Sequence, residues 1–428
     1  MAVFGATFFI NILFTKFRES PVIMSLAPTT TQLSAFPFPA VTICNMNNVR
    51  KSNVASILKL HASRGKTVDK YLIEDFCEKD DEFDFTDSDK NITASWDYIK
   101  KLMIEVSQPC HEMLVYCQWY STKYECSDIF NPALTDEGMC CTFNRVKREF
   151  IFKNPKDMSD LNVTYLHESI DWSPERGYPS ESPITHLPWR PIGAGSHMGL
   201  TIAVDVEADQ YYCSSEHSIG FKVLLHNPIE TPKLASFASA IRAGSETYVH
   251  IMPTIMVSED RIEDISVEKR QCYFINERHL LYYRSYTQKN CIRECEANFT
   301  LTYCGCVLYY MPKDIHTRIC GRKDGWCASY AKRVMDISAG DPNYEDKDFK
   351  LLKPCVCLPG CHEIGYSMSL SSSPLTNLVE IKPEFIKKHD INYFKENMAI
   401  IHLFFTESQF TGILRTRLFG FTEFLCEY

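Results

Sequence analysis

The chain lacks a continuous apolar run long enough to cross a membrane. The nearest candidate is the amino-terminal stretch, which is free of charge up to Lys16 and Arg18. As a helix, this stretch would span about 22 Å, against roughly 30 Å for the hydrocarbon core of a bilayer. It also lacks the basic start and the small-residue cleavage site of a signal peptide. We therefore expect residues 1–17 to be the outer part of a first transmembrane helix.

The chain has no surplus of positive charge. Its 428 residues include 45 Lys and Arg against 54 Asp and Glu, which gives a net charge of −9. Nucleic-acid binders need the opposite balance to neutralise phosphates, so we expect no nucleic-acid partner. Hydrophobic residues make up 45% of the chain, which is enough for a packed core.

Catalytic motifs are also missing. The chain contains no Gly-X-Ser-X-Gly, no His-Glu-X2-His and no phosphate-binding loop. His362 beside Cys361 is compatible with Cys/His catalysis only if the cysteine carries a free thiolate. We expect Cys361 to be bridged, and therefore expect neither enzyme activity nor a cofactor.

The hydrophobic patterns predict an α+β fold. Residues 47–75, 95–120 and 273–335 have helical character, whereas 199–212, 219–228, 246–258, 363–370 and 398–405 read as strands. Five prolines in 171–197 indicate an irregular loop. The acidic run at 78–90 lacks the spacing of a calcium loop, so we favour a solvated loop over a cation site.

Cysteine, in contrast, is abundant, with 19 residues. In the cytosol such a number indicates metal sites, and outside the cell it indicates disulfides. Three Asn-X-Thr sequons favour the secretory route and predict glycosylation at Asn91, Asn162 and Asn298. The odd count leaves at least one cysteine free or paired with another chain.

Ten cysteines lie between residues 272 and 361, and their spacing suggests a ladder of disulfides. Cys291 and Cys295 are one helical turn apart, and Cys355 and Cys357 are on one face of an extended segment. If that segment runs antiparallel beside the helix, the pairs are Cys295–Cys355 and Cys291–Cys357. The same geometry suggests the further pairs Cys272–Cys361, Cys304–Cys327 and Cys306–Cys320. Zinc is the alternative, but the usual Cys-X2-Cys knuckles are absent and we expect no metal.

Several blocks of the sequence resemble the degenerin/epithelial sodium channel superfamily. FPFPAVTICNMNNVRKS (36–52) is similar to its post-membrane signature, and SYTQKNCIRECEANFTLTYCGCVLYYMP (285–312) to its thumb signature. CVCLPGCHEIGYSMSLSSS (355–373), GFKVLLHNPIETP (220–232) and GMCCTFN (138–144) are similar to further family blocks in the same order. HNPIETP, with RQCYFINE (270–277), resembles the insect pickpocket branch.

The resemblance implies a fold like a clenched hand and a function as a channel subunit. It implies finger residues mainly in 45–198, palm and β-ball strands in 199–260, a thumb in 270–361, and palm return strands with a knuckle in 362–417. It also implies a homo- or heterotrimer at the plasma membrane, largely extracellular, that conducts sodium and is blocked by amiloride.

The resemblance further implies disulfides outside the ladder. Two pairs are carried over from the family, Cys44–Cys140 and Cys117–Cys126. For the others, Cys77–Cys110 is a reasonable guess within the finger, which leaves Cys141, Cys213 and Cys426 unassigned. Cys426 would lie next to the membrane and is our candidate for the unpaired thiol.

The chain departs from the family pattern at both ends. The cytosolic His-Gly motif, the Gly/Ser-X-Ser selectivity filter and the second transmembrane helix are not in it, and 418–428 looks like the approach to that helix. We favour an incomplete gene model or splice form of a channel subunit. The alternative is a secreted or tethered ectodomain that modulates other subunits. Glu268 stands where acid-sensing relatives have Trp, so proton gating is not assumed.

Overall fold

The computed structural model describes residues 21–60, 66–77, 95–158, 161, 163–214, 216–340, 355–376, 378, 381–386 and 390–418, together with residues 8, 11, 12, 14, 15, 18 and 19. These residues form a mixed α+β fold, as expected from the sequence. Most of the expected membrane segment 1–17 and almost all of 418–428 lie outside the described residues, as does the acidic run 78–90.

The larger of the main sheets has eight strands in the order β1-β15-β12-β14-β8-β4-β5, with β13 paired to the other side of β12. Its centre is apolar because β8 and β14 are β-branched and aliphatic runs whose side chains are almost all buried. The strands are β1 (Val22–Gln32), β4 (Leu114–Trp119), β5 (Thr122–Tyr124), β8 (Leu200–Asp205), β12 (Ser245–Ser258), β13 (Glu363–Pro374), β14 (Met398–Phe405) and β15 (Gln409–Arg417).

A second, five-stranded sheet has the order β11-β10-β2-β7-β6. Its strands are β2 (Ala40–Asn45), β6 (Phe130–Thr135), β7 (Gly138–Phe143), β10 (Gly220–His226) and β11 (Ser239–Arg242). Phe38 joins the two sheets into one core, since its ring lies 4.8 Å from that of Trp119, 5.6 Å from Phe405 and 6.0 Å from Phe143. A short ribbon of β3 (Asn47–Arg50) and β9 (Tyr211–Ser214) stands apart from both sheets.

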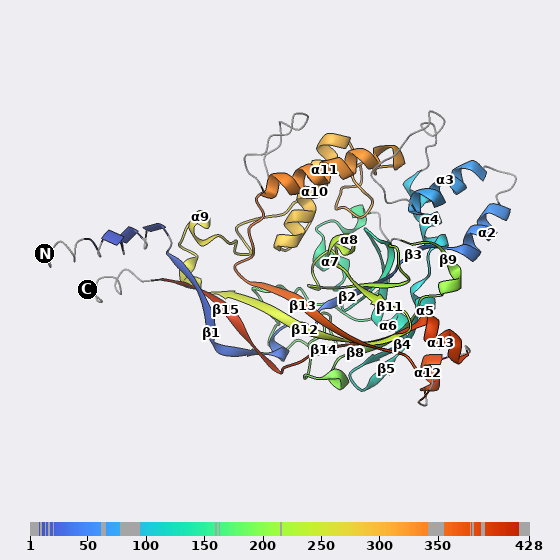
Figure 1. Ribbon diagram of the computed structural model, residues 1–428. Coiled ribbons are helices and arrows are strands. Elements are labelled where there is room, and N and C mark those ends of the chain that lie inside the picture. Colours follow the sequence, from blue (N-terminus) through green and yellow to red (C-terminus); the bar gives the residue numbers. More distant parts are fainter. Residues whose placement is uncertain are drawn as a thin grey trace.

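The helices gather on separate sides of this framework (Figure 1). The long helices α10 (Gln288–Cys304) and α11 (Gly325–Gly340) pack together, and α2 (Lys51–Leu60), α3 (Lys66–Cys77) and α4 (Trp96–Val106) form a group at one end. The short helices are α5 (Cys110–Met113), α6 (Cys126–Ile129), α7 (Arg148–Ile151), α8 (Leu234–Phe237), α9 (Val267–Arg270), α12 (Pro383–Ile386) and α13 (Ile391–Asn397). Within the described residues, none of the helices combines the length and the apolar character needed to span a bilayer.

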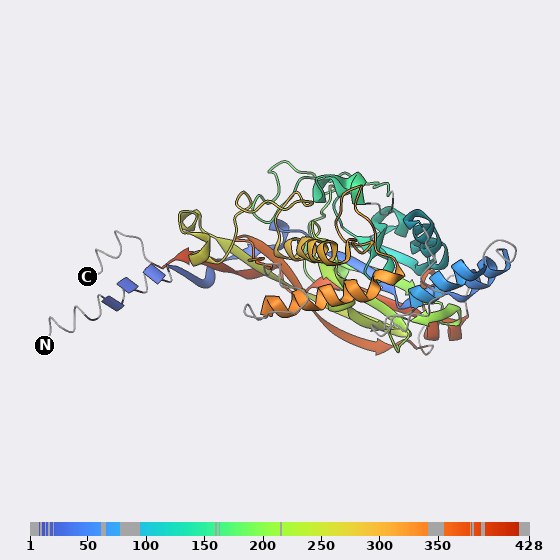
Figure 2. The same ribbon diagram turned by 90° about the horizontal axis from the view of Figure 1, so that it is seen from above.

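Strands β1 and β15 form an antiparallel ribbon that projects from the body (Figures 1 and 2). Pairing runs from Val22 opposite Arg417 to Gln32 opposite Gln409, with an irregularity between Leu26 and Thr30. The Leu418 amide donates to the Pro21 carbonyl, 2.8 Å away, so the two chain segments leave the ribbon side by side. In the half of β15 nearer the outer end, Ile413–Arg415 also run parallel to Met256–Ser258 of β12, which ties the ribbon directly to the large sheet.

Candidate functional site

The best-defined candidate site is the junction between α10 and the five-stranded sheet. Thr287 caps the start of α10, since its side chain accepts a hydrogen bond from the Asn290 amide, and Gly305 caps the end, where its positive φ of 64° suits a glycine. Between these ends, Asn290 bonds to the Thr231 amide and the Ile229 carbonyl. The helix is therefore fixed at its first turn to the segment that follows β10.

Disulfides attach the outer side of α10 to the segment before β13. The structure joins Cys291 to Cys357 and Cys295 to Cys355, with Cα atoms 5.8 and 6.2 Å apart. Three further bonds brace the same region, namely Cys272–Cys361, Cys304–Cys327 and Cys306–Cys320. Cys361 therefore has no free thiol for catalysis with His362. The structure also contains the bonds Cys44–Cys140 and Cys117–Cys126.

The expected pair Cys77–Cys110 is wrong in this structure. Cys77 is bonded to Cys213, with Cα atoms 5.5 Å apart, because β9 pairs with β3 beside the end of α3. Cys110 is bonded to Cys141, with Cα atoms 5.8 Å apart. Adjacent residues of a strand point to opposite faces, so once Cys140 faces Cys44, Cys141 needs a partner on the other side of β7. The two consecutive cysteines, Cys140 and Cys141, are the sequence signal that could have indicated two separate partners.

Several other expected sites fall outside the described residues. These are Asn91, Asn162 and the candidate free thiol Cys426. Asn298 is described, and its side chain is exposed on α10. Glu268 is exposed on α9, and His362 is partly buried, which lowers the pKa of its imidazole.

The inner side of α10 carries a network of buried charges. Arg293 lies 3.3 Å from the Asp136 carboxylate and 3.0 Å from the Glu296 carboxylate, and Lys233 pairs with Glu296. Burial alone would lower the pKa of the Arg293 guanidinium, but Asp136 and Glu296 raise it above its ordinary value. Two cations and two carboxylates thus balance in the interior, a condition that buried charges require.

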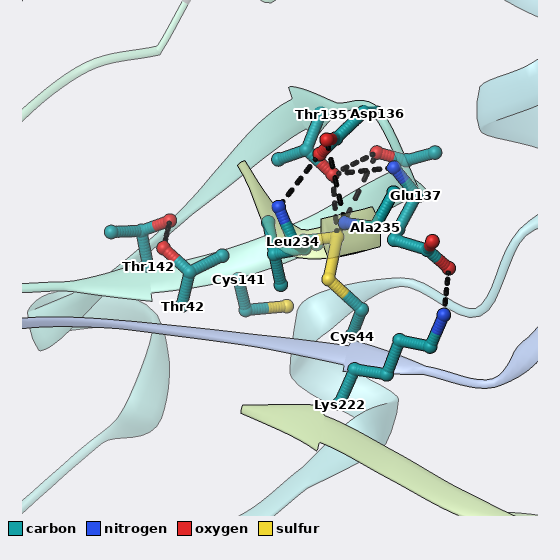
Figure 3. The surroundings of a disulfide bond; sticks show 12 residues. Thr42, Cys44, Thr135, Asp136, Glu137, Cys141, Thr142, Lys222, Leu234 and Ala235 are labelled. Atoms are coloured by element: carbon teal, nitrogen blue, oxygen red, sulfur yellow. Dashed lines mark hydrogen bonds and ion pairs between the residues drawn. A yellow bond between two sulfur atoms is a disulfide. The ribbon is translucent and has the colours of Figure 1, made fainter. Parts of the chain in front are cut away.

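Asp136 links this network to the turn between β6 and β7. Figure 3 shows the surroundings of Asp136 in that turn. Its carboxylate accepts hydrogen bonds from the Leu234 and Ala235 amides at the start of α8, at 2.9 and 3.3 Å. Figure 3 also shows the neighbouring Glu137, which lies 3.0 Å from Lys222 of β10. The turn therefore connects α8, α10 and β10 through charged groups, next to the Cys44 disulfide.

A cavity of about 330 Å³ opens beside the same turn. It lies between α3, α4, the β6–β7 turn and the amino-terminal half of α11. Its wall includes Trp96, whose ring stacks on Tyr309 at 5.3 Å, together with Asn45, Gln108 and Asp136. The volume suits a small ligand, and the mixed aromatic and polar lining is typical of a binding pocket.

Metal binding has little support in the described residues. Among these residues, one group of three possible metal ligands lies close together, namely Cys306, Cys320 and Asp324. The two cysteines are bonded to each other, and the Asp324 carboxylate pairs with Arg318 at 2.8 Å. This group is thus a structural cross-link.

Comparisons with known proteins agree on one family. The sequence profile described as "Amiloride-sensitive sodium channel" matches residues 1–427. Pickpocket protein 28 of Drosophila melanogaster is 34% identical over 99% of this chain and 68% of its own length. Sodium channel protein Nach of Drosophila melanogaster is 24% identical over 97% of this chain and 73% of its own length. Acid-sensing ion channel 1A of Danio rerio is 23% identical over 91% of this chain and 68% of its own length.

Proposed function

Because the chain belongs to the amiloride-sensitive sodium channel family, and is thus a sodium channel subunit and not an enzyme, we propose that it forms a trimeric, sodium-selective channel blocked by amiloride. We place the channel in the plasma membrane with the described body outside the cell. Nine disulfides among the described residues and an exposed sequon at Asn298 support this location, since both features are typical of the secretory route. The trimer is either homomeric or includes other subunits of the family.

We further propose that the body passes an extracellular stimulus to the membrane through the β1–β15 ribbon. The observation that carries this proposal is the attachment of β15 to β12, where Met256–Ser258 run beside Ile413–Arg415. A displacement of the large sheet would reach both strands of the ribbon together, because β1 and β15 are paired along their length.

The subdivision into hand-like parts is also a proposal. We assign the thumb to 270–361, which holds α10, α11 and five disulfides, and the finger to the helices α2–α4 within 45–198. We assign the palm and β-ball to the strands of 199–260, and the palm return strands with the knuckle to 362–417, which contains α12 and α13. The buried charges of Arg293 and Glu296 would then couple thumb and β-ball.

Expression of the complete reading frame that contains residues 1–428 tests the channel function. In oocytes, alone or together with Pickpocket protein 28, we expect an inward current that amiloride blocks and that disappears when sodium is replaced by N-methyl-D-glucamine. Surface biotinylation provides the control for delivery. Protein that reaches the surface but neither carries nor alters an amiloride-blocked current would contradict the proposal.

A further inference from the structure

A second, smaller cavity lies beside strand β6. It has a volume of about 40 Å³ and is lined by β6, by described residues between 145 and 165, by Thr231 and Pro232, by Tyr283 and by residues 309–312. One water needs roughly 10–15 Å³ measured in this way, so the cavity has room for a monatomic ion or a few waters. An organic ligand does not fit.

Arg145 lines this cavity and has no counterion among the residues that the structure describes. Arg145 is only 9% exposed, and its Nε is buried and has no hydrogen-bond acceptor. In the part of the chain that the structure describes, its guanidinium makes neither a hydrogen bond nor an ion pair. An arginine stays protonated in proteins, and a buried charge is stable only when it is paired. Arg145 therefore calls for an anion.

The remaining wall of the cavity favours an anion as well. Among the described lining residues the charged ones are Arg145 and Arg148, and none is a carboxylate. The Arg148 guanidinium already donates to the carbonyls of Leu161 and Pro155, so it adds positive potential while keeping its own partners. The hydroxyls of Thr231 and Tyr283, 3.1 Å apart, add polar groups to the same wall.

The electrostatic effect of Arg145 reaches the residues around it. Burial is the main reason why the pKa of His226 falls to about 3, and the charge of Arg145 is the next. Burial raises the pKa of the Tyr283 hydroxyl to about 12, and Arg145 works against that rise. Both effects place the charge of Arg145 within electrostatic reach of His226 and Tyr283.

We propose that the Arg145 cavity binds a monovalent anion of the size of chloride. The anion would neutralise the guanidinium and would join the segment after β7 to the segments on either side of α10. This inference goes beyond the channel function and does not depend on it.

Thermal unfolding of the full chain in detergent tests the proposal. Chloride is titrated against gluconate at constant sodium concentration and ionic strength, with chloride as the probe and gluconate as an anion too large for the cavity. We expect the melting temperature to rise saturably in chloride, by about 2–4 °C at the plateau. Equal melting temperatures in the two salts would overturn the proposal.

Variants locate the effect. R145M should abolish the chloride dependence, because the charge that needs the anion is gone. R145K should retain it but raise the half-saturating chloride concentration about threefold or more, since an ammonium lacks the planar fork of donors. R176M is the control, because Arg176 is exposed and pairs with Asp171 at 3.2 Å, and it should keep the wild-type response. A chloride response that persists in R145M would refute the site.

Bromide offers a readout that needs no variant. Crystals of the full chain grown in sodium bromide should show an anomalous peak beside the Arg145 guanidinium. No peak at this position, in crystals where other bromide ions are seen, would count against the site even if R145M failed to fold.

Discussion

Single residues in this molecule show two ways to keep an ionisable group in the interior. Arg293 stays charged because Asp136 and Glu296 surround it. His226 is held neutral instead, since burial lowers the pKa of its imidazole to about 3. Its Nδ1 lies 3.0 Å from the Asn227 carbonyl, which can only accept, so Nδ1 carries the proton and Nε2 accepts from the Thr42 hydroxyl.

We expect R293A to destabilise the protein by about 3–5 kcal/mol, because it leaves two buried carboxylates with a single cation, Lys233. Thermal unfolding with the disulfides intact measures the loss. R176A is the matched control, and the loss of its exposed ion pair should cost less than about 1 kcal/mol. Equal effects of the two changes would show that the α10 network is not needed for stability.

His226 should make the fold sensitive to acid. The unfolded chain takes up a proton near the ordinary pKa of about 6.5, whereas the folded state resists until about pH 3. Stability is therefore complete above pH 6.5 and falls below it by up to about 1.4 kcal/mol per pH unit. Melting temperatures between pH 7 and 4 should fall less steeply in H226Q than in the wild type. Parallel curves would exclude His226 as the cause.

At the scale of elements, α10 and its disulfides show what spacing can and cannot reveal. Cysteines four apart on a helix and two apart on an extended segment predicted the pairs Cys295–Cys355 and Cys291–Cys357, because both patterns are local. The partner of Cys77 depends on the pairing of β3 with β9, which are more than 150 residues apart in the chain. Local periodicity holds no information on such a pairing.

Peptide mapping without reduction should recover the links Cys77–Cys213 and Cys110–Cys141. The variant C213S should then expose one new reactive thiol at Cys77, and C110S one at Cys141. A cross-linked peptide containing both Cys77 and Cys110 would contradict the structure. The links within 272–361 serve as the internal reference, since the same digest reports them.

Strand β4 is a second case in which long-range strand pairing determined a structure that the local sequence pattern did not predict. The helical character assigned to 95–120 holds for α4, but Leu114–Trp119 form a strand. This strand pairs with β8, so that Trp119 lies opposite Leu200. The candidate site could not be predicted from the sequence either, because Asp136 and Arg293 are 157 residues apart in the chain. Their ion pair exists only once the β6–β7 turn and α10 have come together.

At the scale of the whole molecule, stability should be unevenly distributed. Strands β8 and β14 lie inside the large sheet with almost every side chain buried, whereas most side chains of the edge strand β1 are exposed. Amide exchange depends on local opening, which is easier where little apolar area is buried.

Hydrogen exchange followed by mass spectrometry should therefore show the slowest exchange in Leu200–Asp205 and Met398–Phe405. Exchange in Val22–Gln32 should be clearly faster, although its amides are paired to β15. Peptides from α10 serve as a comparison, because the disulfides restrict their opening. Equal protection of β1 and β14 would mean that the ribbon is stabilised by contacts outside the described residues.

The geometry of the β1–β15 ribbon also determines how it would respond to mechanical load. Its two strands are antiparallel and are joined at the outer end by the bond between Leu418 and Pro21. If the outer ends were pulled apart sideways, the hydrogen bonds would be loaded one after another, as in the opening of a zipper, so the ribbon would yield at low force. If the outer ends of β1 and β15 were instead pulled together along the ribbon axis, the hydrogen bonds between the two strands would not be sheared. The load would then pass to β12. The ribbon is thus compliant to lateral tension and stiff to axial tension.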